Sequence, residues 1–140
     1  MKQTFLKNEK YIGKDILDEM AFAENYNKFI SNEIIKAFNF YFYKTKKPKI
    51  IDFGAGLGQF STIFKKCDVD FKAIEVDSNL RNILQNKNIK TVHLESIKNN
   101  SVDFIYTVNV LEHIKDDKTK IKNLYAKLKI RGIILIYVPA

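Results

Sequence analysis

The residues best suited to chemistry lie close together after a short apolar run. Asp52 is followed by three glycines at alternate positions, Gly54, Gly56 and Gly58. Glycine allows unusual backbone angles and lets a ligand approach the main chain closely. A strand that ends in such a turn and continues into a helix leaves free N–H groups, which can receive an anionic or polar ligand. This stretch therefore predicts a ligand site.

A second acidic residue, Asp77, lies about 20 residues beyond the glycines, where a carboxylate can accept hydrogen bonds from both hydroxyls of a ribose. It follows a predicted strand and directly precedes Ser78. Asp and Ser also cap helices, so Asp77 could instead begin the helix that follows. The two roles can coexist. Together with the glycines, Asp77 favours a nucleoside ligand.

The glycine spacing separates two kinds of nucleoside ligand. A dinucleotide-binding turn has the pattern Gly-x-Gly-x-x-Gly. Here the spacing is Gly-x-Gly-x-Gly, Gln59 follows, and Asp52 precedes the first glycine. A carboxylate at that place would repel a pyrophosphate, but it could orient amides around a ligand with an ammonium group. We therefore predict a nucleoside without phosphates, and a dinucleotide-binding reductase is disfavoured.

The elements that position these residues alternate between strand and helix. A parallel sheet covered by helices is typical of such alternation. An apolar stripe over 23–43 predicts a helix before the first strand, and Pro48 ends it. We predict an α/β fold with a helical segment at 1–47 and a core at 48–140. The expected strands are 49–53, 71–76, 90–94, 102–108 and 133–138, and the expected core helices are 59–66, 79–85 and 119–128.

Composition excludes several function classes. The chain has 140 residues, is 46% hydrophobic and carries a net charge of +8. Only Arg81 and Arg131 are arginines, and lysine lacks the bidentate fork that reads bases, which disfavours a nucleic-acid partner. The single Cys67 excludes an internal disulfide and a multi-cysteine metal site, and we predict no metal. No run resembles a signal peptide or a membrane span, so we expect a cytoplasmic protein.

Several motifs, in order, resemble the class I S-adenosylmethionine-dependent methyltransferases, in their small-molecule branch. Asp52–Gly58 resembles motif I, Ala73–Ser78 the second-strand motif, and Ser101–Ile114 the fourth-strand motif. Leu128–Pro139 resembles the fifth-strand signature, with Ile130 and Arg131 where Pro and Gly are commoner. The resemblance covers about residues 20–140, and the helix before the core looks like the preface helix of one subgroup.

The resemblance implies a Rossmann-like sheet of order 3-2-1-4-5 and the cofactor S-adenosyl-L-methionine, with S-adenosyl-L-homocysteine as product. The family's sheet has two further strands, so this chain is expected to be C-terminally short. Its fifth strand, 133–138, would then be an unprotected edge. We expect that edge to pair with another chain, as in a homo-oligomer, or the natural protein to be longer.

The resemblance also implies a set of site residues. Gly54 and Gly56 would face the methionine part of the cofactor, and Asp77 would hold the ribose. Residues 95–97 would border the adenine, and Asn109 would lie near the methionine carboxylate or the methyl group. The full set of implied cofactor-binding residues is Asp52, Gly54, Ala55, Gly56, Asp77, Ser78, Glu95, Ser96, Ile97 and Asn109.

Three further side chains have competing interpretations. His113 is the candidate catalytic base, because the ordinary pKa of histidine suits proton transfer near neutral pH. The alternative is that Glu112 and His113 only shape the start of a helix. His93 is expected to be structural. Tyr26, on the helix before the core, could cover the site as part of a lid.

The predicted activity is methyl transfer to a small-molecule acceptor, with sugars and lipid precursors among the candidates. The strand predicted at 102–108 ends in the sequence Val108-Asn109-Val110-Leu111. It is not followed by the Asn-Pro-Pro-Tyr type of loop found in amino-directed DNA and glutamine methyltransferases. No Pro-Cys pair is present for cytosine methylation. The alternative is a non-catalytic S-adenosylmethionine-binding or interaction module, left by loss of the C-terminal strands.

Overall fold

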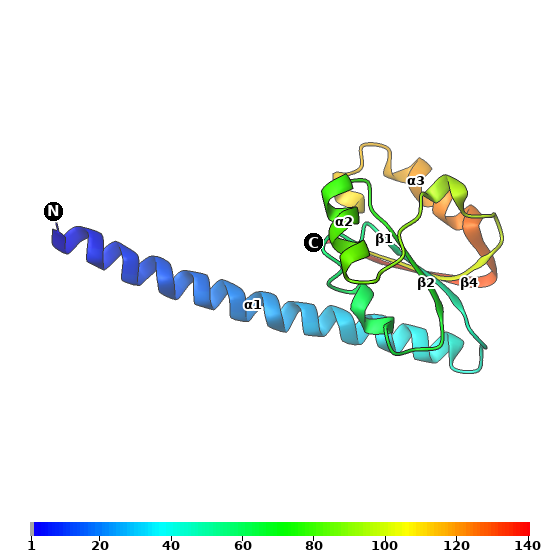
Figure 1. Ribbon diagram of the computed structural model, residues 1–140, viewed down its shortest axis with the longest axis horizontal. Coiled ribbons are helices and arrows are strands. Elements are labelled where there is room, and N and C mark those ends of the chain that lie inside the picture. Colours follow the sequence, from blue (N-terminus) through cyan, green and yellow to red (C-terminus); the bar gives the residue numbers. More distant parts are fainter. Residues whose placement is uncertain (1) are drawn as a thin grey trace. The chain divides into compact units, whose positions relative to one another are not determined.

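A computed structural model describes the backbone of residues 2–140 and the side chains of residues 22–140 (Figure 1). The chain divides into two compact units between Glu33 and Ile34, inside helix α1, which spans Lys2–Phe42. In the first unit the rings of Phe22 and Tyr26 stack 6.5 Å apart. The division into 1–47 and 48–140, and the lid role of Tyr26, stay predictions.

The second unit is built on a parallel four-stranded sheet of order β2-β1-β3-β4. The strands are β1 (Lys49–Phe53), β2 (Asp70–Ile74), β3 (Val102–Val108) and β4 (Leu128–Tyr137). The strand predicted at 90–94 is reduced to one parallel bridge between Thr91 and Ala73, beyond β2. The polar side chains of Lys90, Thr91 and His93 interrupt that segment. The Rossmann-like order predicted from the sequence is confirmed.

The helical elements depart from the predictions at their ends. They are η1 (Ser61–Phe64), α2 (Ser78–Asn86), η2 (Leu94–Ser96), η3 (Leu111–His113) and α3 (Asp117–Lys127). The helix predicted at 59–66 is wrong, because only the short 3₁₀ segment η1 forms there. Helix α3 begins two residues early, since the Asp116 carboxylate accepts a hydrogen bond from the Thr119 N–H at 3.1 Å.

Strand β4 begins earlier than predicted. The strand was expected at 133–138, but it starts at Leu128, directly after helix α3 ends at Lys127, and Gly132 lies within it. The register against β3 shifts between Val102 and Phe104, and Arg131 has a positive φ of 68° beside that irregularity. The chain therefore enters β4 directly from α3 and absorbs extra residues in a bulge.

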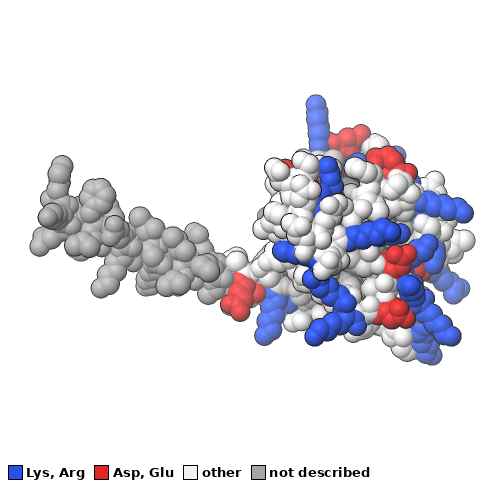
Figure 2. All heavy atoms as spheres, in the orientation of Figure 1, with Lys and Arg blue, Asp and Glu red and all other residues white. Residues whose placement is uncertain are grey.

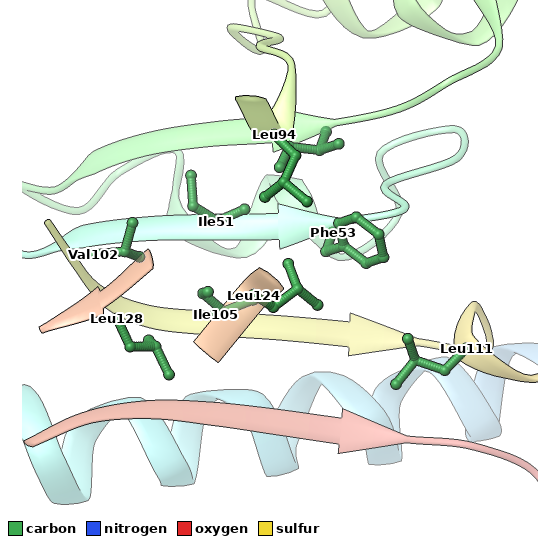
Figure 3. Close-up of a cluster of buried hydrophobic side chains, with 9 residues drawn as sticks. Ile51, Phe53, Leu94, Val102, Ile105, Leu111, Leu124 and Leu128 are labelled. Carbon is green, nitrogen blue, oxygen red and sulfur yellow. The ribbon is translucent and has the colours of Figure 1, made fainter. Parts of the chain in front are cut away.

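An apolar cluster fills one face of the sheet, beneath helix α3 (Figure 3). Leu124 projects from α3 onto the strands and is completely buried. The clustered residues are Ile51, Phe53, Ile74, Leu94, Val102, Ile105, Leu111, Leu124 and Leu128. Burying one such side chain stabilises the fold by about 1.5–3 kcal/mol, so this cluster fixes the strand ends that border the site.

Aromatic rings pack on the other face. Phe38 and Phe42 of α1 lie 6.1 Å and 5.7 Å from the ring of Phe104, and Phe38 lies 5.1 Å from Phe64. Phe42 is buried and Phe38 is partly buried, so the apolar stripe of α1 reaches the core at these two rings. Tyr41, placed in the same stripe, is exposed instead.

Strand β4 lies at the edge of the sheet, with β3 as its neighbour. Ile136 and Val138 near its end are exposed. Pairing of this edge with another chain stays a prediction. In the part of the chain that the structure describes, no helix combines the length and apolarity needed to cross a membrane.

Candidate functional site

A cavity of about 510 Å³ lies at the carboxyl ends of β1, β2 and β3. This is the edge of a parallel sheet at which ligands bind in open α/β folds. Its volume is in the range of small-molecule sites. Its lining residues are Phe53, Gly54, Ile74, Glu75, Val76, His93, Leu94, Glu95, Asn109, Val110, His113, Ile114 and Lys120.

The glycine loop leaves β1 through a backbone conformation that requires glycine. Gly54 has a φ of +76°, and a Cβ atom there would lie 2.4 Å from Cγ2 of Val110. The N–H groups of Gly54 and Ala55 donate to the carbonyl of Ile74, at 2.9 and 3.1 Å. These bonds tie the loop to the end of β2. The predicted glycine turn therefore borders the cavity, with Gly54 in its lining and Ala55 behind it.

Glu75 is one of two carboxylates, with Glu95, that line the cavity. It directly follows β2, and its oxygens accept hydrogen bonds from the N–H of Gly56 at 2.8 Å and the N–H of Asp77 at 3.0 Å. An ionised carboxylate offers about four acceptor positions, so about two stay available to a ligand. Sequence reasoning missed this residue.

Asp77 caps helix α2, which is one of the two roles left open by the sequence. Its carboxylate oxygen accepts hydrogen bonds from the N–H of Asn79 at 2.8 Å and of Leu80 at 3.0 Å. Neither Asp77 nor Ser78 lines the cavity. Two acids, Glu75 and Asp77, lie at the end of the predicted strand. Asp77 directly precedes Ser78, and this Asp-Ser pair is a better helix cap than Glu75. That signal could have assigned the cavity position to Glu75.

Asp52 lies buried beneath the glycine loop, outside the cavity lining. Its carboxylate accepts hydrogen bonds from Oγ of Ser61 at 2.7 Å and from Oη of Tyr106 at 3.0 Å. Burial raises the pKa of Asp52 to about 6, against the lowering effect of these two hydrogen bonds. Burial also raises the pKa of Tyr106 well above 10, which keeps its hydroxyl a donor. Asp52 thus links β1, β3 and the segment after the loop.

Asn109 occupies a strained position at the end of β3. It has a positive φ of 55°, its N–H donates to the carbonyl of Tyr137 at 2.9 Å, and it lines the cavity. Asn tolerates the left-handed region better than most residues do. The structure therefore brings Asn109 into the same cavity lining as Gly54, and its contact with the cofactor stays a prediction.

Residues 95–97, which follow the strand predicted at 90–94, differ in where their side chains lie. Glu95 lines the cavity, whereas Ser96 and Ile97 do not. Ile97 packs against the apolar cluster, and the Ser96 hydroxyl donates to the carbonyl of His93 at 2.7 Å. His93, which the sequence placed in a structural role, is in the cavity lining.

His113 lies on η3 and lines the cavity. Its side chain is 78% exposed, and its Nε2 lies 3.8 Å from a carboxylate oxygen of Glu112. The imidazole is therefore accessible to a molecule in the cavity. Lys120 of α3, which had no sequence signal of its own, adds a cation to the lining. Among residues 22–140, no three His, Cys, Asp or Glu side chains gather as metal ligands.

Comparison with known proteins identifies a shared domain. The family model for a methyltransferase domain matches residues 22–140. A protein described as an S-adenosyl-L-methionine-dependent methyltransferase of Methanococcus maripaludis is 23% identical with a TM-score of 0.64, covering 76% of this chain and 52% of its own. This chain thus spans about half the length of that structure. No curated protein matches the chain.

Two other solved structures share the fold and differ in their named activities. Phosphoethanolamine N-methyltransferase 2 of Haemonchus contortus, in complex with phosphomonomethylethanolamine and S-adenosylhomocysteine, is 20% identical with a TM-score of 0.59, covering 75% of this chain and 27% of its own. The cyclase SpnF is 14% identical with a TM-score of 0.61, covering 74% and 43%. At these identities the likeness establishes the fold alone.

Proposed function

This chain belongs to the methyltransferase domain family, and on that premise we propose that it binds S-adenosylmethionine and transfers a methyl group to a small-molecule acceptor. The observation that carries the proposal is the cavity at the carboxyl ends of the strands, with the Glu75 carboxylate in its wall beside the glycine loop. An acid at this place, next to a turn that admits close approach, suits a nucleoside.

The residues present fit this cofactor. The carboxylate of Glu75 keeps about two acceptor positions beyond its bonds to the loop, which matches the two hydroxyls of a ribose. Val76, Leu94 and Ile114 offer apolar surface for a flat base. The lining holds two carboxylates, Glu75 and Glu95, and no arginine, which suits a cationic ligand better than a pyrophosphate.

Each residue has a defined part in the proposed reaction. Glu75 holds the ribose, and Gly54 and Asn109 border the methionine part. The bound cofactor would supply an electrophilic methyl group, and the chain's own contribution is to position the acceptor in line with it. His113, exposed at the cavity, takes the proton from an acceptor that must lose one. Asp77 stabilises α2 and is assigned no ligand.

The direct test is calorimetric titration of the chain with S-adenosylmethionine, S-adenosylhomocysteine and NAD in parallel. We expect saturable binding of the first two at one site and none of NAD. Binding of NAD alone would overturn the proposal, as would a folded chain that binds none of the three. Saturable binding without turnover on any acceptor tested would favour the non-catalytic module over the enzyme.

A further inference from the structure

A second cavity lies at the opposite, amino-terminal end of the same strands. Its volume is about 320 Å³, and its walls include Lys49 at the start of β1 and Val102 at the start of β3. The floor is apolar, through Ile51 and Val92, while four lysines line the walls. None of these residues belongs to the lining of the candidate methyl-transfer cavity.

One of the four lysines breaks the pattern of its strand. In β2, Phe71 and Ala73 pack together in one apolar cluster, and Ile74 packs in the cluster beneath α3. Lys72 lies between them, paired with Ile51, on the face that Ile51 and Ile74 share. Its side chain is 28% exposed, so much of its aliphatic stem covers the apolar sheet face.

The protein supplies little negative charge to this cavity. Lys49, Lys72, Lys90 and Lys98 face one carboxylate, that of Asp70, which gives a formal charge of +3 (four minus one). Nζ of Lys72 lies 3.7 Å from that carboxylate, at the long end of an ion pair. Figure 2 shows that Lys and Arg side chains outnumber Asp and Glu side chains on the face in view.

The nearby polar groups are already engaged. Asp103 accepts from Nζ of Lys129 through both oxygens, at 3.0 Å each, and from the backbone N–H of Lys49 at 2.8 Å. The hydroxyl of Ser101, in the cavity lining, donates to the carbonyl of Lys98 at 2.6 Å. Recognition in the cavity therefore falls to the lysine ammonium groups, which act as compact point charges and suit phosphate.

We propose that this cavity is a binding site for a small phosphorylated molecule. The phosphate groups would lie among Lys49, Lys72, Lys90 and Lys98, and the body of the ligand over Ile51. A ligand with more than one negative charge offsets the +3 of the walls, which a single carboxylate would not. The site is separate from the proposed methyl-transfer cavity and does not depend on that function.

The test is calorimetric titration with inorganic pyrophosphate at about 0.15 M salt, which screens distant charges beyond roughly 8 Å. The test variant is the double substitution Lys72→Met and Lys98→Met. The matched control, Lys115→Met and Lys118→Met, removes the same charge from exposed lysines outside the cavity. We expect one saturable site in the wild type. The Kd for pyrophosphate should be at least tenfold higher in the test variant and within twofold of the wild-type value in the control.

Three outcomes would overturn the proposal. They are no saturable binding of pyrophosphate, an equal loss in both variants, and binding only to RNA or to anionic vesicles. A urea unfolding curve establishes that each variant is folded. Glu75→Gln should leave the affinity for pyrophosphate unchanged, whereas a change in that affinity would place the pyrophosphate in the other cavity and would also contradict the proposal.

Discussion

Tyr106 donates its hydroxyl hydrogen to the Asp52 carboxylate at 3.0 Å, joining β3 to β1 beneath the glycine loop. Ser61 donates to the same oxygen from η1 at 2.7 Å. Because Asp52 is buried, its protonated form is favoured in the folded state, and its pKa rises from 3.8 to about 6. The loop that borders the candidate cavity thus rests on a titratable group.

The raised pKa of Asp52 predicts a pH-dependent stability. Since the folded pKa exceeds the unfolded one, its contribution is fully present below about pH 3.8 and is lost as the pH rises through about 6. Relative to Asp52→Asn, the free energy of unfolding of the wild type should fall by about 2–3 kcal/mol between pH 4 and pH 7. Urea unfolding of both proteins across this range measures the difference. Parallel pH profiles would contradict the account.

Substituting alanine for each of the two glycines that flank Ala55 should lower the free energy of unfolding by unequal amounts. Gly54→Ala combines a positive φ with a Cβ atom 2.4 Å from Val110, and should cost about 2–4 kcal/mol. Gly56→Ala has a positive φ of 56° but meets no atom within 4 Å, and should cost about 1–2 kcal/mol. Chemical denaturation ranks the two. A greater loss in Gly56→Ala would mean that the loop packs differently.

Leu124 is expected to carry much of the packing of α3 on the sheet. Its side chain is completely buried in the apolar cluster, so Leu124→Ala should lower the free energy of unfolding by about 2–5 kcal/mol. Its neighbour Tyr125 is 72% exposed, and Tyr125→Ala should stay within about 0.5 kcal/mol of the wild type. Similar losses in the two variants would show that α3 does not dock through Leu124.

The helix cap at Asp77 has a predicted cost of its own. Asp77→Ala removes the acceptor for the N–H groups of Asn79 and Leu80, and should destabilise the protein by about 0.5–2 kcal/mol. Thermal unfolding followed by circular dichroism measures this loss. Asp77→Asn keeps a side-chain acceptor and should recover most of it, while an unchanged melting temperature in Asp77→Ala would argue against the cap.

The sequence predicted the fold well because its strands are short, apolar and separated by clear breaks. β3 was predicted with its observed bounds, since Val102–Val108 is almost continuously buried. The strand predicted at 90–94 is only a single bridge between Thr91 and Ala73 in the structure. Its pairing depends on contacts with a segment distant in the sequence, which a local sequence pattern does not record. The helix expected after the glycine loop contracts to Ser61–Phe64, where Ser61 bonds to Asp52.

The site was predicted less completely than the fold. Of the predicted site residues, Gly54, Glu95, Asn109 and His113 line the cavity, and their contacts with a ligand stay predictions. Glu75 was missed because the sequence argument only places an acidic residue about 20 residues beyond the glycines. Glu75 and Asp77 are two residues apart, so that spacing cannot distinguish them. The choice depends on where β2 ends and α2 begins, which is set by the hydrogen bonds of the folded chain.

The measurement that tests the central claim most directly is the affinity for S-adenosylhomocysteine in Glu75→Gln and Asp77→Asn. Glutamine at position 75 removes the charge and replaces one of the two oxygens that accept from the N–H groups of Gly56 and Asp77 with an NH₂ group. We predict a Kd at least tenfold higher for Glu75→Gln, a loss of about 1.5–3 kcal/mol, and a Kd within twofold of wild type for Asp77→Asn. Unchanged affinity in Glu75→Gln, with the loss appearing in Asp77→Asn, would contradict the account.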